Sequence, residues 1–191
     1  MKDSNFEILL KRSMNENIIV SVFSNTNQPE TCSVGYVEAI TKDQVIIKDV
    51  TNTGLTAGYV IRKLENVFRI DIDGMHEQKM HKLYKMQKQS HVSILKYKID
   101  IEANIFMEIL KISHNLGLVV RICVDESDIQ EDIIGLVKEV SGNEVVISRI
   151  DEYGLADGES AIMLDDVVLL NCDTDEDHIL KLLYQDRQTK S

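Results

Sequence analysis

The chain contains an internal repeat with a spacing of 100 residues, and no other feature of the sequence limits its fold as strongly. When each residue is compared with the residue 100 positions later, 18 identities fall between residues 5 and 84 without a gap. The identical positions of the first copy are Phe6, Leu10, Lys11, Ser13, Asn15, Val20, Gly35, Val37, Val45, Ile47, Gly54, Leu55, Gly58, Leu64, Val67, Asp73, Leu83 and Tyr84. The sequence therefore predicts two tandem copies of one domain.

The repeat also sets the expected domain boundaries. The first copy is expected over residues 1–88 and the second over residues 103–191, with residues 89–102 between them. Within that segment, residues 95–101 alternate between apolar and polar side chains. This alternation fits an additional strand or an extended linker, and the sequence leaves both open.

Each copy has the same expected order of elements. An amphipathic helix opens the first copy, and Ser4 and Glu7 are placed to form a capping box at its start. Five runs rich in β-branched residues follow and predict strands. These runs cover residues 18–23, 32–40, 45–50, 59–64 and 67–72. A closing helix begins near Asp73, which we expect to be its N-cap, with Asp173 and Glu176 forming a capping box in the second copy.

The predicted fold is mainly β with flanking helices. Short strands in a domain of this size would expose their edges, and closure into a barrel hides edges. We therefore expect two tandem small five-stranded barrels of the SH3-like kind, each with an N-terminal and a C-terminal helix.

Two runs of the first copy, GYVEAITKDQVIIKDV and VIRKLENVFRID, carry a recognisable pattern of glycine and aliphatic residues. The matching residues are Gly35, Asp49 and Val50 in the first run and Ile61, Arg62, Val67 and Ile70 in the second. The pattern resembles the two sequence motifs of Sm and Sm-like proteins, over about 55 residues in each copy. The chain as a whole resembles a tandem, bacterial-style Sm-like protein.

The resemblance implies RNA binding, because Sm proteins hold bases with a loop after the second strand and an Arg-Gly pair after the fourth. The first copy has Lys42 and Gln44 in that loop, and Arg62 at the arginine position. It departs from the family at Lys63, which replaces the glycine, and the second copy has Ile162 where the arginine would be. These four first-copy residues are candidate RNA contacts, with a polar turn and a surface arginine as the alternative.

A second candidate is the lysine-rich segment from residue 79 to residue 98, which holds no acidic residue. Lys82 and Lys85 lie on its helical part, on the face opposite the apolar residues. Such a face is typical of helices that bind nucleic acid, an anionic membrane or an acidic protein, and also of faces that are only solvated. The second copy is itself a possible partner: residues 101–191 hold 7 Lys and Arg against 20 Asp and Glu, whereas residues 1–100 hold 14 against 12.

Other kinds of site are not expected. The carboxylates and His76 around Asp73 match neither an EF-hand nor a zinc pattern, so no metal or other cofactor is predicted. No nucleophile motif is present, and the five histidines share no repeat position, so no catalytic residue, enzyme activity or small-molecule substrate is predicted. Cys32, Cys123 and Cys172 form no C-x-x-C pair and are expected to fill the core of a cytoplasmic protein.

These observations favour a non-catalytic Sm-like protein that acts as a protein-interaction or assembly module. The expected partners are further copies of the chain, joined through barrel edges, or another protein. The alternative is an RNA-binding regulatory protein that uses the first copy to hold single-stranded RNA. Neither a signal peptide nor a long apolar run is present, so no membrane association is expected.

Overall fold

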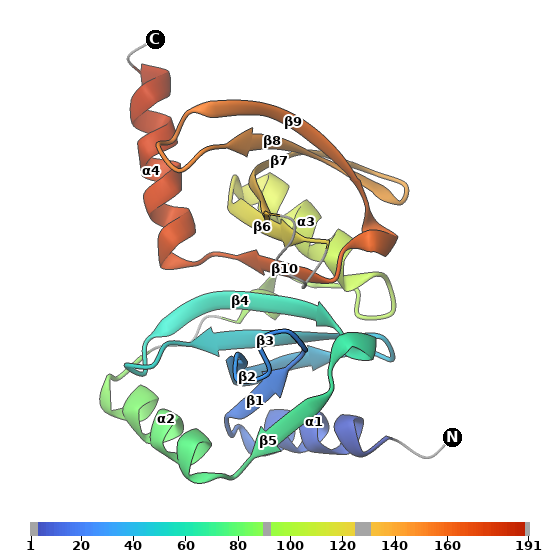
Figure 1. The fold of residues 1–191 in the computed structure, drawn as a ribbon, viewed down its shortest axis with the longest axis vertical. Helices are drawn as coiled ribbons and strands as arrows, with labels where there is room; N and C mark the ends of the chain where they lie inside the picture. Colours follow the sequence, from blue (N-terminus) through green and yellow to red (C-terminus); the bar gives the residue numbers. More distant parts are fainter. Residues whose placement is uncertain (1–3, 90–92, 125–130, 190–191) are drawn as a thin grey trace. The chain divides into compact units, whose positions relative to one another are not determined.

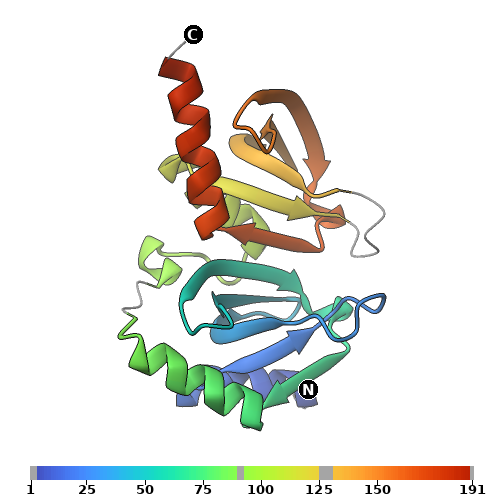
Figure 2. The same ribbon diagram turned by 60° about the vertical axis from the view of Figure 1, so that its left-hand side comes forward.

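The computed structural model describes residues 4–89, 93–124 and 131–189. The chain divides into two compact units, Met1–Ile101 (unit 1) and Glu102–Ser191 (unit 2). Figure 1 and Figure 2 show that each unit is a bent antiparallel sheet accompanied by helices. Among the described residues, no helix is long and apolar enough to cross a membrane.

The two units have the same order of elements. Unit 1 contains α1 (Asn5–Glu16), β1 (Val20–Phe23), β2 (Ser33–Ile40), β3 (Gln44–Val50), β4 (Thr56–Lys63), the 3-10 helix η1 (Leu64–Asn66), β5 (Arg69–Ile72), α2 (Met75–Met86) and the 3-10 helix η2 (Ile94–Tyr97). Unit 2 contains α3 (Ile105–Leu116), β6 (Val119–Cys123), β7 (Ile133–Ser141), β8 (Glu144–Ile150), β9 (Ala156–Met163), the 3-10 helix η3 (Leu164–Asp166), β10 (Leu169–Cys172) and α4 (Asp175–Thr189).

The strand order is the same in both units, as the repeat predicts. It is β5-β1-β2-β3-β4 in unit 1 and β10-β6-β7-β8-β9 in unit 2. The register also shifts at equivalent places, between Val37 and Ala39 in unit 1 and between Val137 and Glu139 in unit 2. The prediction of a mainly β fold with flanking helices is thus confirmed. Within each unit, however, the first and last strands of this order are not paired with each other, so the sheet is not closed.

Two of the repeated glycines are required by close backbone contacts. A Cβ at Gly35 would lie 1.9 Å from the carbonyl oxygen of Lys48, and one at Gly135 would lie 2.1 Å from that of Ser148. No L side chain fits there, because the obstructing atom is backbone and cannot rotate away. The close pairing of β2 with β3, and of β7 with β8, therefore requires glycine at this position in both copies.

The helices cover the sheet with the faces that the sequence predicts. Ser4 and Glu7 form the expected capping box of α1, and Leu10 is fully buried where α1 packs on β2 and β5. On α2, Met80 and Tyr84 are buried in a cluster with Ile19, Val34, Tyr36 and Val50. The helices thus supply burial that the short strands lack.

The predicted caps of the closing helices were wrong by one residue. Asp73 and Asp173 both have a φ of 61°, which is left-handed backbone rather than the extended conformation of an N-cap. Gly74 is the N-cap of α2, and no side chain makes a capping hydrogen bond there. In unit 2, the Asp177 N–H donates to Thr174 Oγ1 (3.1 Å) and the Thr174 N–H donates to Asp177 Oδ2 (3.2 Å), which is a capping box one residue later than expected.

Residues 93–101, which belong to the segment between the copies, contain a 3-10 helix and no strand. Ile94 is buried, and the Ser93 hydroxyl donates to the Glu38 carboxylate on β2. Residues 90–92 lie outside the described residues. The start of the described part is therefore anchored to unit 1 through Ser93, and its described residues form no strand.

Candidate functional site

Four of the predicted RNA contacts lie together at one end of the β3–β4 pair. Gln44 is the register partner of Lys63, Arg62 is the partner of Val45, and Lys42 is exposed in the preceding turn. Gln44 and Arg62 are only 8% and 5% exposed. The Lys63 ammonium lies 3.9 Å from the Glu65 carboxylate.

The guanidinium of Arg62 has partners inside unit 1. Its Nη2 donates to the Ser33 hydroxyl on β2 (3.0 Å), and its charge acts on Asp49. Asp49 accepts a hydrogen bond from the Val34 N–H (3.2 Å). Burial raises the pKa of Asp49 to about 6, and the hydrogen bonds and Arg62 oppose that rise. Both charged residues of the Sm-like pattern therefore take part in the internal structure of unit 1.

The predicted lysines of α2 lie at the other end of the sheet. Lys82 and Lys85 are exposed, and the same helix places Leu83 against Gly54 in the β3–β4 connection. Figure 1 shows α2 at that end of β4, opposite η1. Seven residues of β3 separate the two groups by roughly 20 Å. The six candidate RNA contacts therefore form two separate groups rather than one surface.

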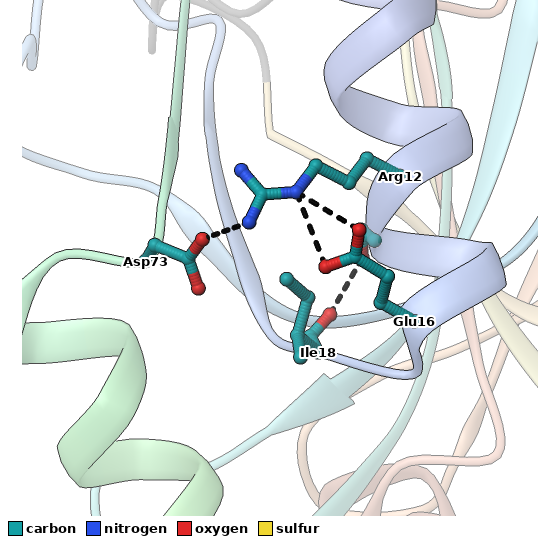
Figure 3. A network of polar contacts seen from close by, with 5 residues as sticks. Arg12, Glu16, Ile18 and Asp73 are labelled. Atoms are coloured by element: carbon teal, nitrogen blue, oxygen red, sulfur yellow. Dashed lines mark hydrogen bonds and ion pairs between the residues drawn. The ribbon is translucent and has the colours of Figure 1, made fainter.

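The carboxylates around α2 are occupied by side chains of unit 1. Asp71 pairs with Arg69 (2.5 Å), and Glu77 accepts a hydrogen bond from the buried Ser21 hydroxyl (2.5 Å). Figure 3 shows Arg12 of α1 reaching both Glu16, at 3.1 Å, and Asp73 before α2. Among the described residues, no group of three or more His, Cys, Asp or Glu side chains could hold a metal ion.

A buried polar cluster that the sequence did not predict lies beneath α2. The Lys48 ammonium, on a side chain only 2% exposed, donates to the Tyr84 hydroxyl (2.8 Å) and lies 5.3 Å from the centre of that ring. The Tyr36 and Tyr84 rings meet edge to face at 5.1 Å, and the Tyr36 hydroxyl lies 2.9 Å from His81 Nδ1. Burial raises the pKa of Tyr36 to about 12 and lowers that of His81.

This cluster exists in one copy only. Tyr184 remains in unit 2, but Leu136, Ser148 and Lys181 stand where unit 1 has Tyr36, Lys48 and His81. The single lysine within the aliphatic run of β3 was the signal in the sequence, and its role depends on tertiary contacts. The repeat thus keeps one backbone and varies the chemistry beneath the closing helix.

The closing helix of unit 2 is flanked by two grooves. One, of about 330 Å³, is lined by Ile134, Ile150 and Leu180 among others. The other, of about 520 Å³, lies where α4 passes Leu118 and Val119 at the start of β6. The equivalent of the second groove in unit 1 has a volume of only about 50 Å³. The second copy therefore offers more accessible space beside its closing helix.

Comparison with known proteins gives no family for this chain. No family model matches it, and neither a curated protein nor a solved structure matches it.

Proposed function

We propose that this chain is a non-catalytic cytoplasmic protein with two tandem Sm-like barrels, and that it acts as a protein-interaction or assembly module. The observation that carries the proposal is the open sheet of each unit. Within unit 1, β4 and β5 end the strand order without pairing with each other, and β9 and β10 do the same in unit 2. The outer edge of each of these terminal strands therefore has no partner strand from its own unit.

Strands with such an edge favour pairing with a neighbour, because unpaired N–H and C=O groups form a template for a further strand. Sm-like proteins assemble by pairing the fourth strand of one barrel with the fifth strand of the next. In this chain the fifth strand is β5 in unit 1 and β10 in unit 2, and each has four residues. The same arrangement would join these barrels to one another, either within the chain or between chains.

The charges support protein rather than RNA as the main partner. Residues 101–191 carry 7 basic and 20 acidic side chains, and such a surface repels phosphates. Arg62, which matches the RNA-binding arginine of the family, is buried and hydrogen-bonded to Ser33.

Molar mass measured by light scattering over a wide range of protein concentration tests this proposal. We expect the average mass to rise above the 21.7 kDa of one chain as the concentration increases. A constant mass of one chain at every concentration would remove the self-assembly part of the proposal.

The alternative function is RNA binding through the first copy, and the exposed lysines of α2 favour it. In that case Lys82→Ala/Lys85→Ala would weaken binding to single-stranded RNA and reduce the salt slope by about 0.7 for each lost contact. Arg62→Ala is a separate variant, whose fold is first checked by circular dichroism because Arg62 is buried. Since the chain contains no Trp, absorbance at 260 and 280 nm after purification at low salt reveals bound RNA sensitively. Absence of RNA affinity at low salt would eliminate this alternative.

A further inference from the structure

The closing helix of unit 2 exposes large apolar side chains on one face. Ile179, Leu182 and Leu183 are 60%, 66% and 42% exposed. Their spacing of three and four residues places them side by side on α4. We call these three residues the α4 ridge.

The fold itself does not require this ridge. The closing helix of unit 1 occupies the same place in the repeat and has Lys79 and Lys82 at the positions of Ile179 and Leu182. Both lysines are exposed. The second copy therefore presents aliphatic side chains where the first presents charged ones, and packing within the unit does not explain the difference.

The α4 ridge lies between the two grooves of unit 2. Ile179 and Leu183 border the 330 Å³ groove, whose floor includes Ile134 and Ile150. Leu182 borders the 520 Å³ groove on the other side of the helix. An apolar partner that covered the ridge could therefore also place side chains into the grooves and away from water.

Acidic residues surround the ridge. Asp175 and Asp186 lie one turn before and one turn after it on the same side of α4. Glu176 and Glu152 line the 330 Å³ groove, where Arg121 pairs with Glu176 (3.2 Å). Asp173, Asp177 and Lys181 are among the residues that line the 520 Å³ groove, so acidic side chains outnumber basic ones around the ridge.

Two copies joined α4 to α4 would bring like charges together, and the basic helix α2 of a second copy has its apolar residues Met80 and Tyr84 buried in its own unit. A partner with lysine or arginine beside exposed apolar residues would be attracted.

We propose that the α4 ridge and its grooves bind a basic amphipathic helix of another protein. The proposal rests on the interaction function proposed above, and it identifies the surface and the class of partner. Apolar side chains of the partner helix would cover Ile179, Leu182 and Leu183, and its basic side chains would face the surrounding carboxylates.

The probe for this proposal is a fluorescein-labelled, amidated 14-residue peptide of leucine and lysine, with leucine at helical spacing. Its affinity for the full chain is measured by fluorescence anisotropy at physiological salt. A second peptide has glutamate in place of every lysine. The variant Ile179→Gln/Leu182→Gln removes the ridge without changing charge. The control, Met75→Gln/Met86→Gln, removes two apolar side chains of α2 that are 86% and 68% exposed.

We expect the lysine peptide to bind the wild-type chain and to lose at least about tenfold in affinity for Ile179→Gln/Leu182→Gln. The control variant should stay within about twofold of wild type, and the glutamate peptide should bind at least about tenfold more weakly. Equal binding to wild type and the ridge variant would overturn the proposal, since net charge alone would then explain the affinity.

Light scattering on the ridge variant separates the remaining outcomes. If Ile179→Gln/Leu182→Gln reduces the molar mass of the self-associated chain, the ridge binds a second copy and the proposal of a basic partner is wrong. If the ridge variant loses the peptide and still self-associates, both proposals stand. If the wild-type chain stays a monomer and binds the peptide through the ridge, strand-edge assembly fails and the α4 ridge proposal remains.

Discussion

Replacing Tyr84 by Phe tests the buried polar cluster of unit 1 by removing a single hydroxyl. That hydroxyl accepts the hydrogen bond of the Lys48 ammonium at 2.8 Å, and Lys48 is only 2% exposed. Phe keeps the ring and its edge-to-face contact with Tyr36. A hydrogen bond to a charged group contributes roughly 1.5–3 kcal/mol, so we expect Tyr84→Phe to destabilise unit 1 by about 2 kcal/mol.

The double variant sharpens this prediction. In Lys48→Met/Tyr84→Phe, an apolar side chain of similar length replaces the ammonium, so no buried charge is left without its acceptor. We expect the double variant to be more stable than Tyr84→Phe alone, with a coupling energy of about 1 kcal/mol or more.

Tyr184→Phe in unit 2 is the matched control. Tyr184 is half-buried, its hydroxyl has no hydrogen bond among the described residues, and Ser148 stands at the lysine position. We expect its effect to stay within about 0.5 kcal/mol. Calorimetry and urea unfolding followed by circular dichroism measure these changes. Equal effects of Tyr84→Phe and Tyr184→Phe, or additive effects in the double variant, would refute the role of the Lys48–Tyr84 pair.

Three further predictions concern other features of the two units. Burial raises the pKa of Asp49 to about 6 from an ordinary value of 3.8, so its protonation stabilises the folded state fully below about pH 4 and this contribution is lost as the pH rises to about 6. Asp49→Asn should therefore lose less stability than wild type between those pH values in urea unfolding. Gly35→Ala and Gly135→Ala should each destabilise their unit by more than about 2 kcal/mol in thermal unfolding. Gly142→Ala should cost only about 1 kcal/mol, because an added Cβ would meet nothing within 4 Å and the only strain comes from its φ of 58°. Thr174→Ala should lower stability by about 1 kcal/mol if Thr174 caps α4, and an unchanged melting temperature would contradict that assignment.

The parts of the fold that depend on local pattern could be predicted from the sequence. Runs rich in β-branched residues located the five strands of the first copy, and the repeat extended them to the second copy. Ser4 and Glu7 cap α1 as expected because both partners lie within one turn. The caps of the closing helices were placed one residue early, since the left-handed backbone of Asp73 and Asp173 has no signature that separates it from an N-cap aspartate.

The parts that depend on contacts distant in sequence could not be predicted. Lys48 meets Tyr84 across 36 residues, and only the packing of α2 on the sheet brings them together. Arg62 matched a family position by sequence, but its burial and its bond to Ser33 follow from the pairing of strands. The exposure of Ile179 and Leu182 could not be predicted from the sequence either, because aliphatic residues at helical spacing normally predict a buried face.

Hydrogen–deuterium exchange at increasing protein concentration tests the proposed assembly most directly. If strand edges join the barrels between chains, exchange of backbone amides should slow with concentration in at least one of the terminal strands β4, β5, β9 and β10. The inner strands β2 and β7 should be unaffected, because both of their edges are paired within their own unit. Exchange rates that do not depend on concentration in all four terminal strands, together with a constant monomer mass, would contradict assembly through strand edges.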